Sequence, residues 1–206
     1  RKFILLACGQ QKAESWNNEN SKVDLFWMKE QVEHILIRLG IKKFKGIAIN
    51  NSYLNNGFSF TIKKNTIATF GAVKKKILKS FDVKSEVLYA EFDWDRILEL
   101  CKVSKTSYQV VPKFPVVRRD LALLVDSSIE FKTLQSLANQ CENELLKSIN
   151  LFDFYDGEKV PKGKKSYALS FILQDENKTL TEKQIEKVMD KLIKAFQEKA
   201  EAEIRM

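Results

Sequence analysis

The sequence of 206 residues is poor in the residues from which most recognisable catalytic and metal sites are built, with one histidine, three cysteines and seven glycines. Cys8, Cys101 and Cys141 are far apart and fit neither a zinc-binding spacing nor a paired framework. We therefore expect them to be reduced, buried thiols of an intracellular protein. The sequence contains no glycine-rich phosphate loop, nucleophile elbow or metal-ligand spacing, so we expect neither a catalytic nor a metal site.

Long apolar runs are also absent, and a membrane-spanning helix needs about 20 such residues. Residues 1–10, RKFILLACGQ, pair a basic end with a short apolar patch. A signal peptide remains an alternative, but a first core strand is favoured because polar residues stop the patch at once. The chain begins at Arg1 rather than at methionine, and we interpret it as a piece of a longer, cytoplasmic protein.

The net charge of +8 is compatible with nucleic-acid binding but does not establish it. Residues 1–100 contain 17 lysines and arginines against 11 acidic residues, and residues 101–206 contain 18 against 16. The second half is therefore close to neutral. If it binds nucleic acid, we expect it to do so through a local, shaped surface.

The first half predicts an α+β domain over residues 1–107, with an antiparallel sheet and a packed helix. Its helix starts with Asp24 as the cap, ends at Gly40 and shows one apolar face, formed by Leu25, Met28, Val32, Ile35, Leu36 and Leu39. Strands are expected at residues 3–8, 47–49, 58–62, 67–70 and 87–92, a lysine-rich helical turn at 74–79, a closing helix at 93–100 and a linker at 103–107. His34 is interpreted as a boundary residue, and the lysine-rich turn as a solvated face, with phosphate contact as its alternative.

The second half, residues 108–206, predicts a β-α-β-β-α-β order, the ferredoxin-like fold. Its strands are expected at 119–125, 149–155, 165–173 and 202–205. Ser127 with Glu130 and Thr181 with Gln184 predict capping boxes for the two helices. The apolar helix faces are Phe131, Leu134, Leu137, Ala138, Cys141 and Leu145 in the first, and Ile185, Val188, Met189, Leu192, Ile193 and Phe196 in the second.

Alternation along these strands assigns the side chains to two faces of the sheet. The face under the helices should carry Leu121, Leu123, Val125, Phe152, Phe154, Tyr167, Leu169, Phe171 and Ile204. The open face should carry Asp120, Ala122, Leu124, Asp153, Tyr155, Ser166, Ala168, Ser170, Glu203 and Arg205. In the usual strand order of this fold (fourth, first, third, second), the small side chains of Ala122, Ser166 and Ala168 form a low central floor. Tyr155 then lies at one edge of this floor and Arg205 at the other.

Such a floor leaves room for a planar ligand. The Tyr155 ring can stack on an unpaired base, Asp153 and Ser166 can contact base edges, and Arg205 can hold phosphate or a base. From the pattern alone, two alternatives stay open: the floor packs on another domain, or it is simply solvated.

Three motifs in the second half carry a family resemblance: PKFPVVRRDLALLVD at 112–126, LFDFYDGEKVPKGKKSYALSF at 151–171 and KTLTEKQIEKVMDKLIKAF at 178–196, closed by EIR at 203–205. They resemble the ferredoxin-fold anticodon-binding domain at the end of the bacterial phenylalanyl-tRNA synthetase β subunit. Residues 23–41, 70–83 and 89–97 resemble the domain before it more loosely. There the family has a class II synthetase-like domain without catalytic residues. The stretch NNSYLNNGFSF at 50–60 departs from the family's His-Pro before the glycine.

The resemblance implies a non-catalytic part of an (αβ)₂ phenylalanine–tRNA ligase, which uses ATP and Mg²⁺, with catalysis in the α subunit and tRNA-Phe as partner. No cofactor is expected in this piece itself. The implied anticodon contacts are Ala122, Asp153, Tyr155, Ser166 and Arg205. Possible phosphate contacts are Arg118, Arg119, Lys162, Lys164 and Lys165, with ion pairing as the alternative for the arginines and a solvated tip for the lysines. Two other functions stay open: a purely structural module that holds the α subunit, and a module for a small regulatory ligand.

Overall fold

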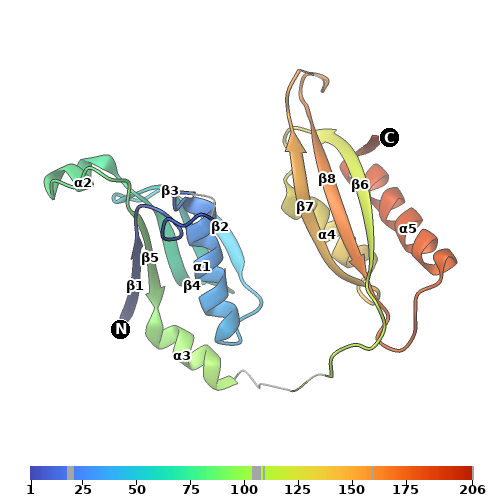
Figure 1. Cartoon of the computed structure of the whole chain (residues 1–206), viewed down its shortest axis with the longest axis horizontal. Helices are drawn as coiled ribbons and strands as arrows, with labels where there is room; N and C mark the ends of the chain where they lie inside the picture. The colour runs from blue at the N-terminus through green and yellow to red at the C-terminus, as the bar shows by residue number, and fades with distance from the viewer. Residues whose placement is uncertain (18–20, 104–107, 109, 159, 206) are drawn as a thin grey trace. The chain divides into compact units, whose positions relative to one another are not determined.

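The computed structural model describes residues 1–17, 21–103, 108, 110–158 and 160–205. The chain divides into two compact units, Arg1–Tyr108 and Gln109–Met206. Each unit packs helices on an antiparallel sheet (Figure 1), which confirms the predicted α+β class. The predicted boundary, between residues 107 and 108, lies one residue earlier. Of the predicted linker at 103–107, Val103 belongs to a helix and the other four residues lie outside the described part.

Unit 1 is built on a five-stranded antiparallel sheet with the order β1-β5-β4-β3-β2. Its core lies between this sheet and helix α1, with α3 completing it. The elements, in chain order, are β1 (Lys2–Ala7), α1 (Leu25–Arg38), β2 (Lys45–Ile49), β3 (Leu54–Ile62), β4 (Asn65–Val73), α2 (Lys75–Ser80), β5 (Leu88–Asp93) and α3 (Trp94–Val103).

Helix α1 follows its sequence pattern closely. The Asp24 side chain accepts a hydrogen bond from the Trp27 backbone N–H at 2.7 Å, which satisfies one of the free donors of the first turn. Met28, Val32 and Leu36 are fully buried against the sheet. Gly40 follows the helix with a φ of 82°, a left-handed conformation that glycine adopts without steric cost. The predicted cap, face and end of this helix are therefore confirmed.

Unit 2 has the predicted β-α-β-β-α-β order and a four-stranded antiparallel sheet. Its elements are β6 (Val117–Asp126), α4 (Phe131–Cys141), β7 (Leu146–Tyr155), β8 (Lys164–Leu173), α5 (Glu182–Ala200) and β9 (Glu203–Arg205). The strand order is β9-β6-β8-β7, which is fourth, first, third, second. This confirms the ferredoxin-like fold.

Both helices of unit 2 contribute to one core on one face of the sheet (Figure 1). Leu123, Val125, Leu169 and Phe171 point into it from β6 and β8 and are fully buried. Phe196 of α5 meets Phe171 with ring centroids 6.1 Å apart. The opposite face of the sheet carries no helix of this unit among the described residues, so its side chains form a surface.

Helix α5 begins with the predicted capping box. The Gln184 backbone N–H donates to Thr181 Oγ1 at 3.4 Å, and the Gln184 side chain accepts from the Thr181 N–H at 3.1 Å. Replacing such a cap with alanine costs about 1 kcal/mol. We therefore expect Thr181→Ala to lower the unfolding free energy of unit 2 by about that amount in urea denaturation followed by circular dichroism.

The capping box predicted for α4 is wrong, and Ser127 supplies a matched control. The N-cap is Glu130, without a side-chain cap bond. Residues before it form a turn in which the Ser128 hydroxyl and backbone N–H both donate to Asp126 Oδ1 and lower the pKa of that carboxyl. Ser127→Ala should therefore leave stability nearly unchanged. An equal loss in both variants would contradict the assignment of the caps.

Leu145 and the cysteines depart from their predicted positions. Leu145 packs on the core, but it lies beyond the end of α4 at Cys141. Cys8 is exposed rather than buried, because β1 is an edge strand and ends at Ala7. Cys101 and Cys141 are partly buried, and all three are free thiols.

None of the described helices is long and apolar enough to cross a membrane.

Candidate nucleic-acid interface

The strand register of unit 2 aligns residues of all four strands in rows across the open face. Arg205 on β9 pairs with Ala122 on β6, Ala122 pairs with Ala168 on β8, and Ala168 pairs with Asp153 on β7. Antiparallel partners point to the same face of a sheet. These four side chains therefore form one continuous row from edge to edge.

A second row runs beside the first. It consists of Glu203 on β9, Leu124 on β6, Ser166 on β8 and Tyr155 on β7, paired in that order. Because these residues lie two positions along their strands from the first row, they share its face. The structure thus brings all five predicted contacts together on two adjacent rows: Ala122, Asp153, Tyr155, Ser166 and Arg205.

The centre of this face is low and its edges are high. The methyl groups of Ala122 and Ala168 form the middle of the first row, and Ser166, only 8% exposed, lies next to them. Tyr155 is 39% exposed on edge strand β7, and Arg205 is exposed on edge strand β9. A planar group on the floor can therefore meet an aromatic ring at one side and a guanidinium at the other.

The ring of Tyr155 lies against Gly157. A methyl group at Gly157 would lie 2.5 Å from the Tyr155 hydroxyl oxygen and 2.6 Å from Cζ, closer than real contacts allow. Only glycine at this position therefore leaves room for the ring where the structure places it. Gly157 is not among the predicted site residues, because nothing in the sequence around it distinguishes it from an ordinary turn glycine.

Asp153 is oriented by its own strand. One of its carboxylate oxygens accepts a hydrogen bond from the Phe154 backbone N–H at 2.8 Å. This bond limits the rotation of the side chain and leaves the carboxylate at the edge of the open face, where a base edge with N–H donors would meet it.

Phe152 does not lie under the helices as predicted. A β-bulge separates the pairs Leu151 with Leu169 and Asp153 with Ala168, so Phe152 is the extra residue. The bulge shifts the alternation by one position and turns this side chain to the open face. Arg118 Cζ, from β6, lies 5.2 Å from the Phe152 ring centroid. Phe154, on the other side of the bulge, points to the helix face and contacts Tyr167 at 5.6 Å between centroids.

Both arginines at the entrance of β6 are engaged in the ion pairs considered as alternatives. Arg118 donates to the two carboxylate oxygens of Asp120 at 2.8 and 3.1 Å, and this bond raises the pKa of Arg118. Arg119 donates to Glu182, at the start of α5, at 2.5 Å. Exposed pairs of this kind contribute at most about 1 kcal/mol, so phosphate contact by either arginine stays a prediction.

The lysines of the hairpin differ in orientation. Lys164 pairs with Glu203 on the open face, whereas Lys165 lies on the helix side with its Nζ 5.1 Å from the Tyr167 ring centroid. Lys162 is exposed in the turn. Lys159 lies outside the described residues. Among the predicted phosphate contacts, Lys164 is thus the lysine closest to the two rows.

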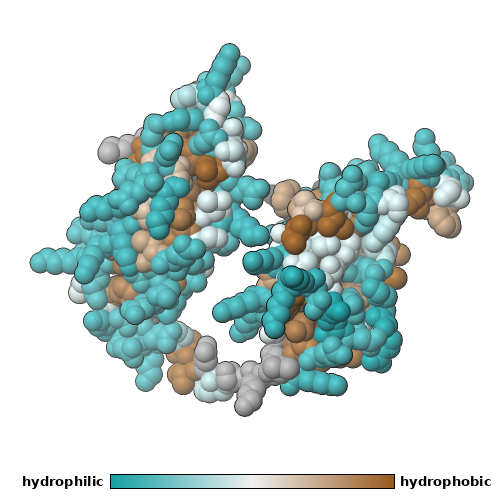
Figure 2. All heavy atoms as spheres, turned by 180° about the vertical axis from the view of Figure 1, so that it is seen from behind, coloured by the Kyte–Doolittle hydropathy of each residue, from teal (hydrophilic) through white to brown (hydrophobic). Residues whose placement is uncertain are grey.

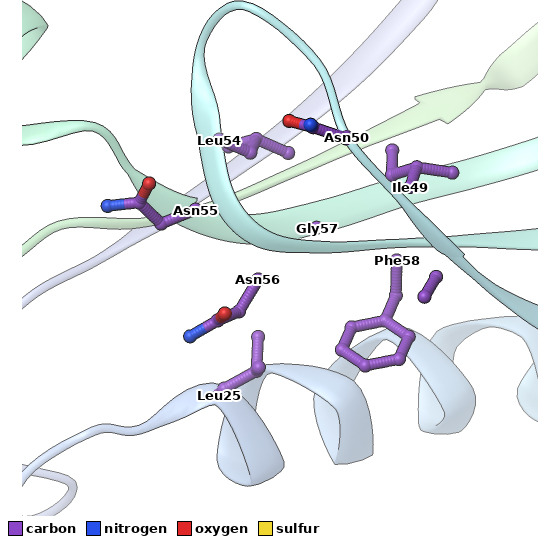
Figure 3. Close-up of a pocket in the computed structure, with 9 residues that line it drawn as sticks. Leu25, Ile49, Asn50, Leu54, Asn55, Asn56, Gly57 and Phe58 are labelled. Carbon is purple, nitrogen blue, oxygen red and sulfur yellow. The ribbon is translucent and has the colours of Figure 1, made fainter.

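Unit 1 contains a pocket where the sequence departs from the family pattern (Figure 3). Its volume is about 500 Å³, and its polar lining comes from Asn50, Asn55 and Asn56, beside apolar residues such as Leu25 and Phe58. Asn56 has a φ of 48°, which asparagine tolerates better than most residues. The side chains that line the pocket include no titratable group, so the pocket supplies no acid or base.

The described part of the chain shows no cluster of metal-ligating side chains. Among the described residues, no three His, Cys, Asp or Glu side chains come together as a group that could hold a metal ion. His34 is exposed, and its Nε2 lies 3.9 Å from Glu30 one helical turn away.

Comparison with known proteins connects both units to one enzyme subunit. Residues 112–205 match the ferredoxin-fold anticodon binding domain, and residues 1–94 match the phenylalanyl tRNA synthetase beta chain CLM domain. The phenylalanine–tRNA ligase beta subunit of Bacteroides fragilis is 40% identical over 206 residues, which is 98% of this chain and 25% of that protein. The beta subunit of Clostridium acetobutylicum is 37% identical over 186 residues, 89% of this chain and 23% of that protein.

The chain spans about a quarter of the length of these relatives. The two domain matches follow each other in the order of the two structural units. The chain therefore belongs to the phenylalanine–tRNA ligase beta subunit family, as its C-terminal part with a ferredoxin-fold anticodon-binding domain.

Proposed function

We propose that residues 108–206 bind the anticodon stem-loop of tRNA-Phe on the open face of the β9-β6-β8-β7 sheet, as a non-catalytic part of phenylalanine–tRNA ligase. The observation that carries the proposal is the pair of rows on that face. They gather an aromatic ring, a carboxylate, a hydroxyl and a guanidinium around a floor of two alanines. These are the groups that recognise unpaired bases in RNA loops.

Each group has a separate part in binding. The Tyr155 ring, which lies against Gly157, stacks on one anticodon base. Asp153 accepts hydrogen bonds from a base edge, and Ser166 can donate or accept. Arg205 holds a phosphate or a base from the opposite edge. The short side chains of Ala122 and Ala168 leave space above the sheet for a base between Tyr155 and Arg205.

We infer that unit 1 supports subunit assembly. Its edge strand β1 exposes Phe3, Ile4 and Leu6, and α1 exposes Phe26 and Ile37. Hydrophobic patches interrupt the mostly hydrophilic surface visible in Figure 2. Exposed apolar residues on an edge strand fit a surface that another chain or segment covers. In the complete cytoplasmic enzyme, an (αβ)₂ assembly, the α subunit would carry catalysis with ATP and Mg²⁺.

The competing function is a structural module without RNA contact. An interface that only packs would favour apolar side chains at the centre of the sheet and would leave no buried carboxylate. The open face instead carries Asp153, Ser166 and Arg205 around two alanines. This polar arrangement favours RNA binding.

An NMR titration tests the proposal. The ¹⁵N-labelled chain is titrated with a tRNA-Phe anticodon stem-loop, and separately with a stem-loop of altered anticodon, at one low ionic strength. We expect chemical-shift changes at Tyr155, Ser166 and Arg205. These changes should be smaller with the altered anticodon, because contacts to bases depend on sequence.

Lys162→Ala is the control for phosphate binding. Because phosphate contacts do not depend on base sequence, loss of the Lys162 side chain should either leave binding unchanged or weaken the binding of both stem-loops equally. Shifts confined to lysines and equal for the two loops would contradict anticodon reading. In that case the structural module would be the better account.

A further inference from the structure

The β-bulge in β7 gives unit 2 a second exposed aromatic ring on the open face. The bulge places Phe152 and Asp153 on the same face, because Asp153 pairs with Ala168 while Leu151 pairs with the buried Leu169. Phe152 is 49% exposed. A large apolar ring in such a position gains little from packing within its own unit.

Arg118 holds this ring from across the sheet. It lies on β6, whereas Phe152 lies on β7, and β8 runs between them. The guanidinium is itself fixed by its two hydrogen bonds to Asp120 on the same face. Ser170 of β8 also belongs to the open face by register, yet it is only 4% exposed. The Arg118 side chain, which reaches Phe152 on β7, has to cross β8 in this part of the sheet.

The ring and the guanidinium together form a surface suited to nucleobases. Aromatic rings and guanidinium planes both stack on bases. Phe152 and Tyr155 are three residues apart on one strand, which corresponds to at most about 10 Å at about 3.3 Å per residue, because the bulge shortens this stretch. Asp153 lies between them. Two bases splayed out of a loop could thus be held at the same time, one on each ring.

We propose that Phe152, held by Arg118, is a second base-stacking position that extends the RNA-binding face beyond Tyr155. This inference rests on the proposed function and adds to it a binding position for another unpaired nucleobase of the loop. Stacking is tolerant of base identity. The position therefore adds affinity for an unpaired loop rather than selectivity among bases.

Phe154 provides a matched control on the same strand. It is 48% exposed, almost the same as Phe152, but lies on the helix side against Tyr167. In the whole chain, Phe152→Ala should weaken binding of the tRNA-Phe anticodon stem-loop by about 5- to 150-fold. Phe154→Ala should change it by less than about twofold, because that ring faces away from the RNA. Thermal unfolding of both variants checks that the fold is retained.

A tryptophan at the same position gives a direct readout and should keep the affinity. Trp16, Trp27 and Trp94 all lie in unit 1, so their fluorescence can be subtracted with the parent chain. Addition of the stem-loop should quench the extra emission of Phe152→Trp and leave that of Phe154→Trp unchanged.

The outcomes separate this inference from the proposed function. Unchanged affinity in Phe152→Ala, with weakened binding in Tyr155→Ala, would overturn the second position and leave the proposed function standing. Equal losses in Phe152→Ala and Phe154→Ala would also overturn it. If neither Tyr155→Ala nor Phe152→Ala changed binding, the proposed function itself would fail.

Discussion

Tyr155→Ala is expected to weaken binding of the anticodon stem-loop by about 1–3 kcal/mol, or about 5- to 150-fold in Kd. The ring is the aromatic group at the edge of the Ala122 and Ala168 floor, and it lies against Gly157. Alanine removes the stacking surface but keeps the strand, whose pairing with Ser166 involves only the backbone. Fluorescence anisotropy with a labelled stem-loop at constant salt measures the change.

Tyr155→Phe is the matched control. It keeps the ring and removes only the hydroxyl, so most of the affinity should remain. A loss as large as that of Tyr155→Ala would mean that the hydroxyl, and not stacking, carries the contact. Full affinity in Tyr155→Ala would remove this residue from the binding face.

Phe196→Ala should cost unit 2 about 3–5 kcal/mol of unfolding free energy. The side chain is fully buried and packs on Phe171 between α5 and the sheet. Its removal leaves a cavity that the surrounding rings cannot fill completely. Because a domain of this size is stable by only about 5–15 kcal/mol, much of its stability would be lost.

The two units allow this effect to be assigned. All three tryptophans belong to unit 1, so their fluorescence follows the unfolding of that unit, whereas circular dichroism follows both. In Phe196→Ala, part of the circular dichroism signal should be lost at a lower urea concentration than in the parent chain. The unfolding midpoint measured by tryptophan emission should stay unchanged. Phe154→Ala, which removes a half-exposed ring, serves as the control. A matching early change in tryptophan emission would show that the units do not unfold independently.

Most of unit 2 could be predicted because local and long-range requirements agree there. In strand β6, Leu121, Leu123 and Val125 pack on the core in alternation, and the pairing of β6 with β8 runs through ten consecutive positions. Thr181 and Gln184 mark the start of α5 in sequence and in structure. Alternation along the strands placed the five candidate contacts on one face, and the register confirms that grouping.

The errors arise where one local pattern competes with another. Ser127 and Glu130 have the spacing of a capping box, but Asp126 binds Ser128 instead and the turn uses those residues. Phe152 and Phe154 look equivalent by alternation, and only the pairing with β8 reveals the bulge between them. Cys8 stands in an apolar stretch, yet it follows the end of β1, a strand at the edge of its sheet.

The strand order also predicts the order in which the parts of this face form during folding. β7 and β8 follow each other along the chain, and hairpins of this kind close in about 1–10 μs. The pairing of β6 with the three-residue strand β9 joins distant segments, and we expect it to form later because such closure is entropically costly. A partly folded chain would thus carry Tyr155 and Asp153 but lack Arg205. In the folded protein the short edge strand should open most easily, and an RNA phosphate on Arg205 would hold it closed, so that the ligand completes the folding of its own site.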